Sequence, residues 1–231
     1  HAYAVSEGGQ GIRVYNMENI DSGQVAFEGT VTSGGSTATH NVAIDTDSGF
    51  LYRTGGSNNG LRIYSLDNPS SPQLVGEWQD RYVHDAQIRA FDTVNIGGQI
   101  GFFRQIAFCC SGFNGGSVDT GLTIVDVTNK SNPVVLSQTA YSSRAYSHQA
   151  WLSEDGQTLF LNDELDEQNF GSPTTTRVFD VSDLANPVEI TTFTNGKSAI
   201  DHNLYVKNGI MYAANYRSGL RIFDVSDPMN A

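Results

Sequence analysis

The segment Gly219-Leu220-Arg221-Ile222-Phe223-Asp224-Val225-Ser226-Asp227 decides the fold, because versions of it recur along the whole chain. The other copies span 11–16, 60–67, 121–128 and 176–183, and Thr175 stands at the glycine position of the fourth copy. The copies therefore begin at positions 11, 60, 121, 175 and 219, which are 44 to 61 residues apart. A repeat of this length is typical of a β-propeller blade.

Two further features recur with this segment. An Asn-Pro or Asp-Pro pair ends or closely follows four of the copies: Asn68-Pro69, Asn132-Pro133, Asn186-Pro187 and Asp227-Pro228. Because proline cannot donate to a strand ladder, these copies are predicted to be strands that stop at a turn. A histidine with a short polar neighbour opens an apolar run ahead of each later copy, and a turn then leads to a second apolar run. The pairs are His40-Asn41, His84-Asp85, His148-Gln149 and His202-Asn203. Each repeat thus predicts four antiparallel strands.

The sequence predicts an all-β fold, a single propeller domain over 1–231 with about five blade repeats. Whole four-stranded blades are expected at 40–78, 84–139 and 148–194, and partial blades at 1–31 and 202–227. We expect the chain to be a fragment of a larger propeller, because both partial blades would leave strand edges open. Self-assembly through these open edges is one further expectation.

Composition narrows the classes of function. The chain has 231 residues, with 13 Lys and Arg against 25 Asp and Glu, a formal charge of −12. So few cations exclude a nucleic-acid partner, because a phosphate backbone needs many of them. No apolar run approaches the ~18 residues of a membrane span. The acidic composition, poor in lysine, favours an extracellular or cell-surface protein.

The two cysteines, Cys109 and Cys110, are adjacent. Neighbouring thiols cannot join distant segments, so the core must supply the stability. Two interpretations stay open: two thiols on a strand with one facing inward, or a vicinal disulfide.

Several long elements resemble those of LVIVD-repeat proteins, specifically the choice-of-anchor B family of bacterial exported proteins. The elements are Gly121-Leu122-Thr123-Ile124-Val125-Asp126-Val127-Thr128, Tyr146-Ser147-His148-Gln149-Ala150-Trp151-Leu152, Asn162-Asp163-Glu164-Leu165-Asp166-Glu167 and Ile200-Asp201-His202-Asn203-Leu204-Tyr205-Val206. The resemblance implies a propeller displayed outside the cell by a separable C-terminal anchor, and it implies no established reaction.

In a propeller the first strand of each blade lines the central channel, so His40, His84, His148 and His202 are expected at similar heights around one axis. Neutral imidazoles bind Zn, Cu, Fe or Ni, which makes this ring a candidate transition-metal site. A structural hydrogen bond to the neighbouring blade would produce the same repeat. Both interpretations stay open, and Asp201 lies directly before the last histidine.

An acidic run follows one predicted strand: Asp163, Glu164, Asp166 and Glu167. Four carboxylates within five residues repel one another unless a cation neutralises them, and calcium is the natural hard cation outside the cell. A calcium site and a plain solvated acidic loop are the two interpretations.

Two functions are carried forward. The first is a surface-displayed propeller that acts as a binding, adhesion or assembly module for an extracellular protein or glycan, with calcium as a stabiliser. The second is a metal-dependent enzyme, or a polysaccharide lyase or hydrolase, with a His-lined site at the channel mouth. A base at His148 with Tyr146 and Arg144, or His202 with Tyr205, Tyr216 and Arg217, would serve such chemistry.

Overall fold

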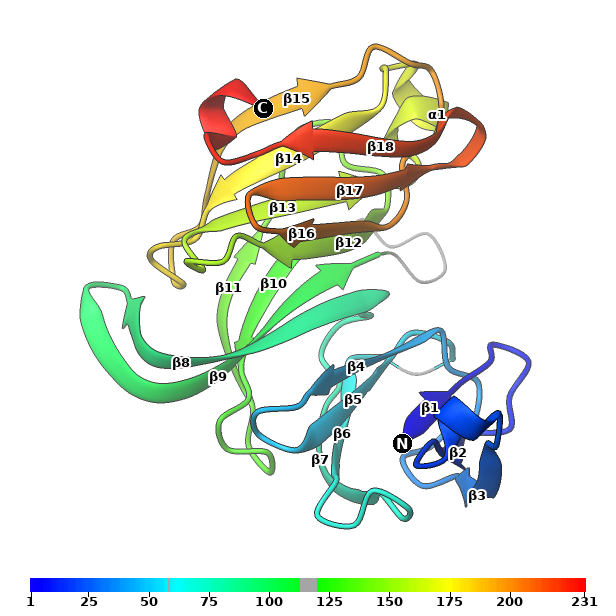
Figure 1. Cartoon of the computed structure of the whole chain (residues 1–231). Helices are drawn as coiled ribbons and strands as arrows, with labels where there is room; N and C mark the ends of the chain where they lie inside the picture. The colour runs from blue at the N-terminus through cyan, green and yellow to red at the C-terminus, as the bar shows by residue number, and fades with distance from the viewer. Residues whose placement is uncertain (58, 113–119) are drawn as a thin grey trace.

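The computed structural model describes residues 1–57, 59–112 and 120–231, and within these residues eighteen strands form five antiparallel sheets. The sheets follow one another in chain order from the N-terminus to the C-terminus (Figure 1). The three central sheets have four strands each and the two outer ones have three. The predicted all-β propeller of four-stranded antiparallel blades is therefore confirmed.

Each blade is a meander in which neighbouring strands in the sequence pair with each other. The central blades are β4 (Asn41–Asp45), β5 (Phe50–Thr54), β6 (Leu61–Ser65) and β7 (Gln73–Trp78); β8 (Asp85–Ile96), β9 (Gln99–Ser111), β10 (Gly121–Asp126) and β11 (Val134–Thr139); and β12 (Ser147–Leu152), β13 (Thr158–Asp163), β14 (Thr175–Asp180) and β15 (Val188–Thr194). The outer blades are β1 (Ala2–Ala4), β2 (Ile12–Asn16) and β3 (Ala26–Val31), and β16 (Leu204–Lys207), β17 (Ile210–Asn215) and β18 (Gly219–Asp224).

Helical segments are short throughout the described ranges. They are α1 (Asp166–Phe170) and the 3₁₀ turns η1 (Ile20–Ser22), η2 (Tyr216–Ser218) and η3 (Pro228–Asn230). None of the helices in the described part of the chain has the length and apolar character needed to span a membrane.

The first strands of successive blades lie side by side: β4 contacts β8, β8 contacts β12, and β12 contacts β16. Each of these strands begins at or within two residues of a repeated histidine. The innermost strands therefore bring together residues that are more than 160 positions apart in the sequence.

The glycine that opens the recurring segment has a steric role. Gly60 has φ +71°, and a Cβ atom there would lie only 1.6 Å from the carbonyl oxygen of Trp78, at the end of the paired outer strand β7. A Cβ atom at Gly121 would likewise lie 2.6 Å from the carbonyl oxygen of Thr139 on β11. At Gly60 and Gly121, only a residue without Cβ allows this close approach.

The apolar core lies between blades. One cluster joins Phe108 and Ile124 of one blade to Leu161 and Phe179 of the next, and the other clusters join the remaining neighbours in the same manner. Successive side chains of a strand point to opposite faces, and here both faces are covered. The inner strands of a blade are consequently apolar on both sides.

The adjacent cysteines show this two-sided burial. Cys110 packs in the cluster on one side of β9 and Cys109 in the cluster on the other, and both are free thiols with no exposed surface. The expectation that only one thiol faces inward is wrong, because neighbouring blades cover both faces of the strand. The vicinal disulfide is not formed in this structure.

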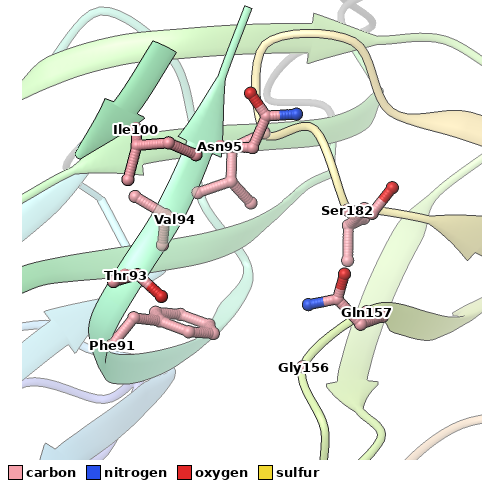
Figure 2. Close-up of a pocket in the computed structure, with 10 residues that line it drawn as sticks. Phe91, Thr93, Val94, Asn95, Ile100, Gly156, Gln157 and Ser182 are labelled. Atoms are coloured by element: carbon pink, nitrogen blue, oxygen red, sulfur yellow. The ribbon is translucent and has the colours of Figure 1, made fainter. Parts of the chain in front are cut away.

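Strands β8 and β9 are about twice as long as the others and extend as a curved hairpin beyond their own blade (Figure 1). The hairpin docks on the next blade through Asn95, whose carbonyl accepts from Leu184, and through Gly97, which donates to Asp183. A small pocket of about 180 Å³ lies between the two (Figure 2), with Phe91 and Ile100 on the hairpin side and Gln157 on the other.

Candidate metal centre

The backbone holds each histidine at the start of its innermost strand. The amide of His40 donates to the carbonyl of Thr54 at 3.1 Å, and the amide of His84 donates to the carbonyl of Cys110 at 2.8 Å. A polar side chain in the preceding blade then reaches across: Thr54 Oγ1 donates to the carbonyl of His84 at 3.0 Å, and Asn162 Nδ2 donates to that of His202 at 3.4 Å. His84 is therefore held from two blades at once.

The four imidazoles form a continuous row. Ring centroids are 3.9 Å apart between His40 and His84, 4.2 Å between His84 and His148, and 4.0 Å between His148 and His202. His84 and His148 are buried, whereas His40 and His202 at the two ends are partly exposed. The structure thus gathers all four histidines of the predicted ring in one place.

The tautomer of His84 follows from its surroundings. Its Nδ1 lies 3.0 Å from the carbonyl oxygen of His148, and a carbonyl only accepts, so Nδ1 carries the proton. Nε2 then keeps its lone pair free, which is the form in which imidazole binds a metal. The hydrogen bond to the neighbouring blade and the metal-ligand interpretation are therefore compatible in the same residue.

Burial and mutual repulsion keep the central imidazoles neutral. Burial, helped by the neighbouring imidazole of His40, lowers the pKa of His84 to about 3. Burial and the imidazole of His84 lower the pKa of His148 to about 2. Metal binding requires neutral imidazole, so no proton competes for these two ligands at neutral pH.

Two groups of three ligands occur among the described residues, and His148 belongs to both. The first is His40, His84 and His148, and the second is His148, Glu164 and His202; in each, the ligand atoms all lie within 4.8 Å of one another. Both ring nitrogens of His148 are buried, and Nε2 lies 3.6 Å from Oε2 of Glu164, beyond hydrogen-bond range. An unpaired buried polar atom is unfavourable, and a bound ion would remove that penalty.

Glu164 is the carboxylate of the second group. Its oxygens lie 3.6 Å from Nε2 of His148 and 3.8 Å from Nε2 of His202, and the hydroxyl of Tyr216 donates to it. The ring of Tyr216 also lies 5.3 Å from that of His202. A mainly apolar pocket of about 360 Å³, lined by Ile200, Tyr216 and Arg217, begins beside this group. Tyr216 therefore connects this pocket to the Glu164 carboxylate.

A second polar layer lies next to the histidines along the innermost strands. Asp85 accepts hydrogen bonds of 2.9 Å from both Asn41 and Gln149, and its own strand supplies the amide of Ala86 at 2.7 Å. Burial raises the pKa of Asp85. This layer links three blades and borders a pocket of about 310 Å³.

The acidic run divides into parts with different surroundings. Asp163 is fully buried and accepts from Tyr141 Oη and the amides of Ala145 and Tyr146 at 2.7 to 2.8 Å. Glu164 points to the histidines. Asp166 and Glu167 are buried on α1, where Arg177 contacts Asp166 at 2.8 Å. The interpretation as a solvated loop is wrong, because three of the four side chains are buried.

Asp201 joins Asp166 and Glu167, and sequence reasoning did not assign it to them. Its amide faces Glu167 Oε1 at 3.4 Å. Burial raises the pKa of Asp201 well above its usual range, and the carboxyl groups of Glu167 and Asp166 raise it further. Burial and the adjacent Asp166 carboxyl raise the pKa of Glu167 to about 8. The only signal in the sequence is an acidic residue directly before a repeated histidine, where other blades have Thr39, Val83 and Ser147.

The remaining residues suggested for acid–base work have structural contacts. Arg144 donates to the carbonyl of Tyr141, and Tyr205 packs edge-on against Trp151 with centroids 4.8 Å apart. Tyr146 lies beside His84, with its ring 6.4 Å from that of His148. Tyr216 and Arg217 are the members of this set that border the pocket at Glu164.

Comparison with known proteins agrees with the repeat and the fold. The model of the LVIVD repeat matches residues 116–139. The sequence matches none of the curated proteins compared with it.

Three solved structures share the fold at low sequence identity. A protein from Lactobacillus plantarum aligns with a TM-score of 0.60 at 11% identity over 93% of this chain and 62% of its own. A candidate 6-phosphogluconolactonase from Bacteroides uniformis aligns with a TM-score of 0.61 at 12% identity, over 99% of this chain and 67% of its own. Saccharomyces cerevisiae Sqt1 aligns with a TM-score of 0.52 at 10% identity, over 98% of this chain and 62% of its own. The chain thus spans 62% to 67% of these structures' lengths.

Proposed function

We propose that this propeller is a metal-dependent enzyme whose ion is held by His148, Glu164 and His202. The observation that carries the proposal is the convergence of two imidazoles and one carboxylate from different blades, with ligand atoms within 4.8 Å. Two histidines and one glutamate with an open fourth position are the ligand set of several hydrolytic zinc sites. When bound, such an ion lowers the pKa of a water molecule and polarises a carbonyl or phosphoryl oxygen.

The residues around the triad support a hydrolytic function. Tyr216 donates to Glu164 and so orients the carboxylate toward the imidazoles. Ile200 and Tyr216 supply apolar surface in the pocket that Tyr216 shares with Glu164, and Arg217 supplies the positive charge of the same pocket. An ester or glycoside with an acidic group nearby is the substrate class that this lining favours, and anionic polysaccharides belong to it.

The test begins with the protein stripped of metal by a chelator and dialysed. Zn²⁺, Mn²⁺, Ni²⁺ and Cu²⁺ are added separately, bound metal is measured by mass spectrometry, and hydrolysis is followed on ester, lactone and anionic-glycan substrates. We expect stoichiometric binding and metal-dependent hydrolysis in the wild type and in His1→Ala, whose ring lies outside the row at Glu28. His148→Ala, which removes a ligand of both triads, should lose both while keeping its circular dichroism spectrum. Equal metal content in His148→Ala and wild type would overturn the proposal.

A second candidate function is a binding or adhesion module outside the cell, as the resemblance implies. One observation favours it: the β8–β9 hairpin exposes Ile100, Phe102 and Phe103, and Phe103 is 77% exposed. Exposed apolar side chains gathered at one place often mark a contact surface for a partner. A Phe102→Ser, Phe103→Ser double variant should lose binding to extracellular glycans or proteins while keeping metal content. Unchanged binding of such ligands would reject this role for the hairpin.

A further inference from the structure

A pocket of about 310 Å³ lies between the innermost strands β4, β8, β12 and β16, and we name it the strand pocket. Each described residue that lines it follows a repeated histidine by one to four positions, and none of them is a histidine. Pockets that bind small molecules have volumes of about 300 to 1,000 Å³. The size of the strand pocket therefore fits a ligand of one or two rings.

The lining differs from blade to blade, although the histidines do not. The third position after the histidine is Ala43 on β4, Gln87 on β8, Trp151 on β12 and Tyr205 on β16. The rings of Trp151 and Tyr205 meet edge to face, with centroids 4.8 Å apart and planes at 70°. The repeated fold does not account for this aromatic pair, because two other blades do without it.

The carboxyl and amide oxygens of the lining side chains are already occupied by protein donors. Both oxygens of Asp85 accept hydrogen bonds within the polar layer described above. The side-chain oxygens of three amides accept from backbone N–H groups at 2.7 to 2.8 Å. These bonds run from Leu204 to Gln149, from Leu152 to Gln87 and from Val42 to Asn41. The network therefore fixes which end of each amide is the donor.

Several donors of the same side chains have no protein acceptor. Asn41 Nδ2 and Gln149 Nε2 each use one hydrogen on Asp85, at 2.9 Å, and each keeps a second hydrogen. In the part of the chain that the structure describes, no protein atom accepts from these second hydrogens, from Nε2 of Gln87 or from Nε1 of Trp151. The strand pocket is thus lined by donors that an oxygen-rich ligand would satisfy.

We propose that the strand pocket binds an uncharged saccharide, with a sugar ring against Trp151 and Tyr205 and its oxygens accepting from the free amide hydrogens. The C–H bonds of a sugar ring carry partial positive charge and pack well on the negative face of an aromatic ring. Hydroxyl and ring oxygens are acceptors that match the free donors.

The charges around the pocket exclude an acidic sugar. An anion would lie beside the carboxyl group of Asp85, and none of the described lining residues is Lys or Arg to compensate its charge. The pocket at Tyr216, by contrast, contains Arg217. The inference is independent of the proposed metal-dependent function, because no proposed metal ligand lines the strand pocket.

The experiment titrates the full chain with neutral tetrasaccharides of glucose, xylose, mannose and N-acetylglucosamine, and with tetragalacturonate as the acidic probe. Binding is measured by calorimetry and by tryptophan fluorescence, which reports Trp151 because the other tryptophan, Trp78, is 5% exposed. We expect at least one neutral sugar to bind with a Kd below about 1 mM, and tetragalacturonate to bind at least about 10-fold more weakly. Protein treated with EDTA should bind equally well.

Matched variants test the two parts of the pocket. Gln87→Glu keeps an acceptor for the amide of Leu152 and replaces the free donor, so the affinity should fall at least about 10-fold. Tyr205→Ala, at a 49% exposed position, should lose a similar factor. Gln99→Glu, at the exposed hairpin turn, is the control and should bind like the wild type. Thermal midpoints check that each variant is folded.

The outcomes separate this inference from the metal site. No binding of any neutral tetrasaccharide by the wild type, or unchanged affinity in folded Gln87→Glu and Tyr205→Ala, would overturn it. Equal affinity for tetragalacturonate would overturn the preference for uncharged sugars. Sugar binding that persists in protein without metal or hydrolytic activity would support the strand pocket while the metal-dependent function fails.

Discussion

Nδ1 of His84 lies 3.0 Å from the carbonyl oxygen of His148, so one imidazole of the row is oriented by the backbone of the next blade. This contact joins the two functions of a repeated histidine. It connects adjacent blades, as any structural residue of a propeller does, and it leaves Nε2 without a proton for a metal. The orientation of the His84 ring therefore depends on the neighbouring blade.

The two triads are separable by mutation. Glu164→Gln removes the carboxylate of the second triad, so a bound Cu²⁺ should move to His40, His84 and His148. Electron paramagnetic resonance of the bound Cu²⁺ should then show nitrogen ligands only. His40→Ala is the matched control, because it removes only the first triad and should keep mixed nitrogen and oxygen ligation. Identical spectra in both variants would contradict the assignment of two triads.

Asp163 should be important for stability and not for metal binding. In Asp163→Asn, an amide nitrogen replaces an oxygen that faces donors, so we expect a loss of about 2–3 kcal/mol in the free energy of unfolding. Tyr141→Phe removes only one of these bonds, the 2.8 Å contact to Oδ2, and should lose about 1–1.5 kcal/mol. Urea unfolding measures both values. A larger loss in Tyr141→Phe than in Asp163→Asn would count against this ranking.

Two equivalent glycines should respond differently to alanine. Gly60 and Gly219 have φ values of +71° and +72°, but only Gly60 lies against a carbonyl, while a Cβ at Gly219 would meet nothing within 4 Å. Gly219 has ψ −156°, a backbone region that only glycine adopts readily, so Gly219→Ala should lose about 1–3 kcal/mol from backbone strain alone. Gly60→Ala adds the clash with a carbonyl oxygen and should lose more than Gly219→Ala. Thermal and urea unfolding give the comparison. Equal losses would show that the close approach is relieved without cost.

The cysteines should be unreactive in the folded protein. Burial raises the pKa of the Cys109 thiol and raises that of Cys110 well above its usual range, so neither forms a thiolate at pH 8. Ellman's reagent should label no thiol in native protein at pH 8 and two thiols in guanidinium chloride. Rapid labelling before unfolding would show that β9 is accessible from one face.

Most of the fold was predictable from local signals. The recurring glycine, the alternation of apolar residues and the proline that follows are short-range constraints, so they indicate strands, turns and the blade period without any knowledge of tertiary contacts. The repeated histidines likewise indicated a common axis, because symmetry of the repeat places equivalent residues at equivalent positions. The ring centroids of neighbouring histidines lie 3.9 to 4.2 Å apart, which agrees with that expectation.

The composition of each site depended on contacts between blades, which a single sequence does not specify. Four acidic residues in one run look equivalent in the sequence. In the structure, Asp163 at the end of β13 accepts several hydrogen bonds, and Glu164 faces the histidines. Asp166 and Glu167 are buried on α1. The partner of that last pair, Asp201, lies in another blade. Local sequence determined the repeat and its strands, whereas the packing of one blade on the next decided which side chains meet, because that packing alone sets their distances and removes their water.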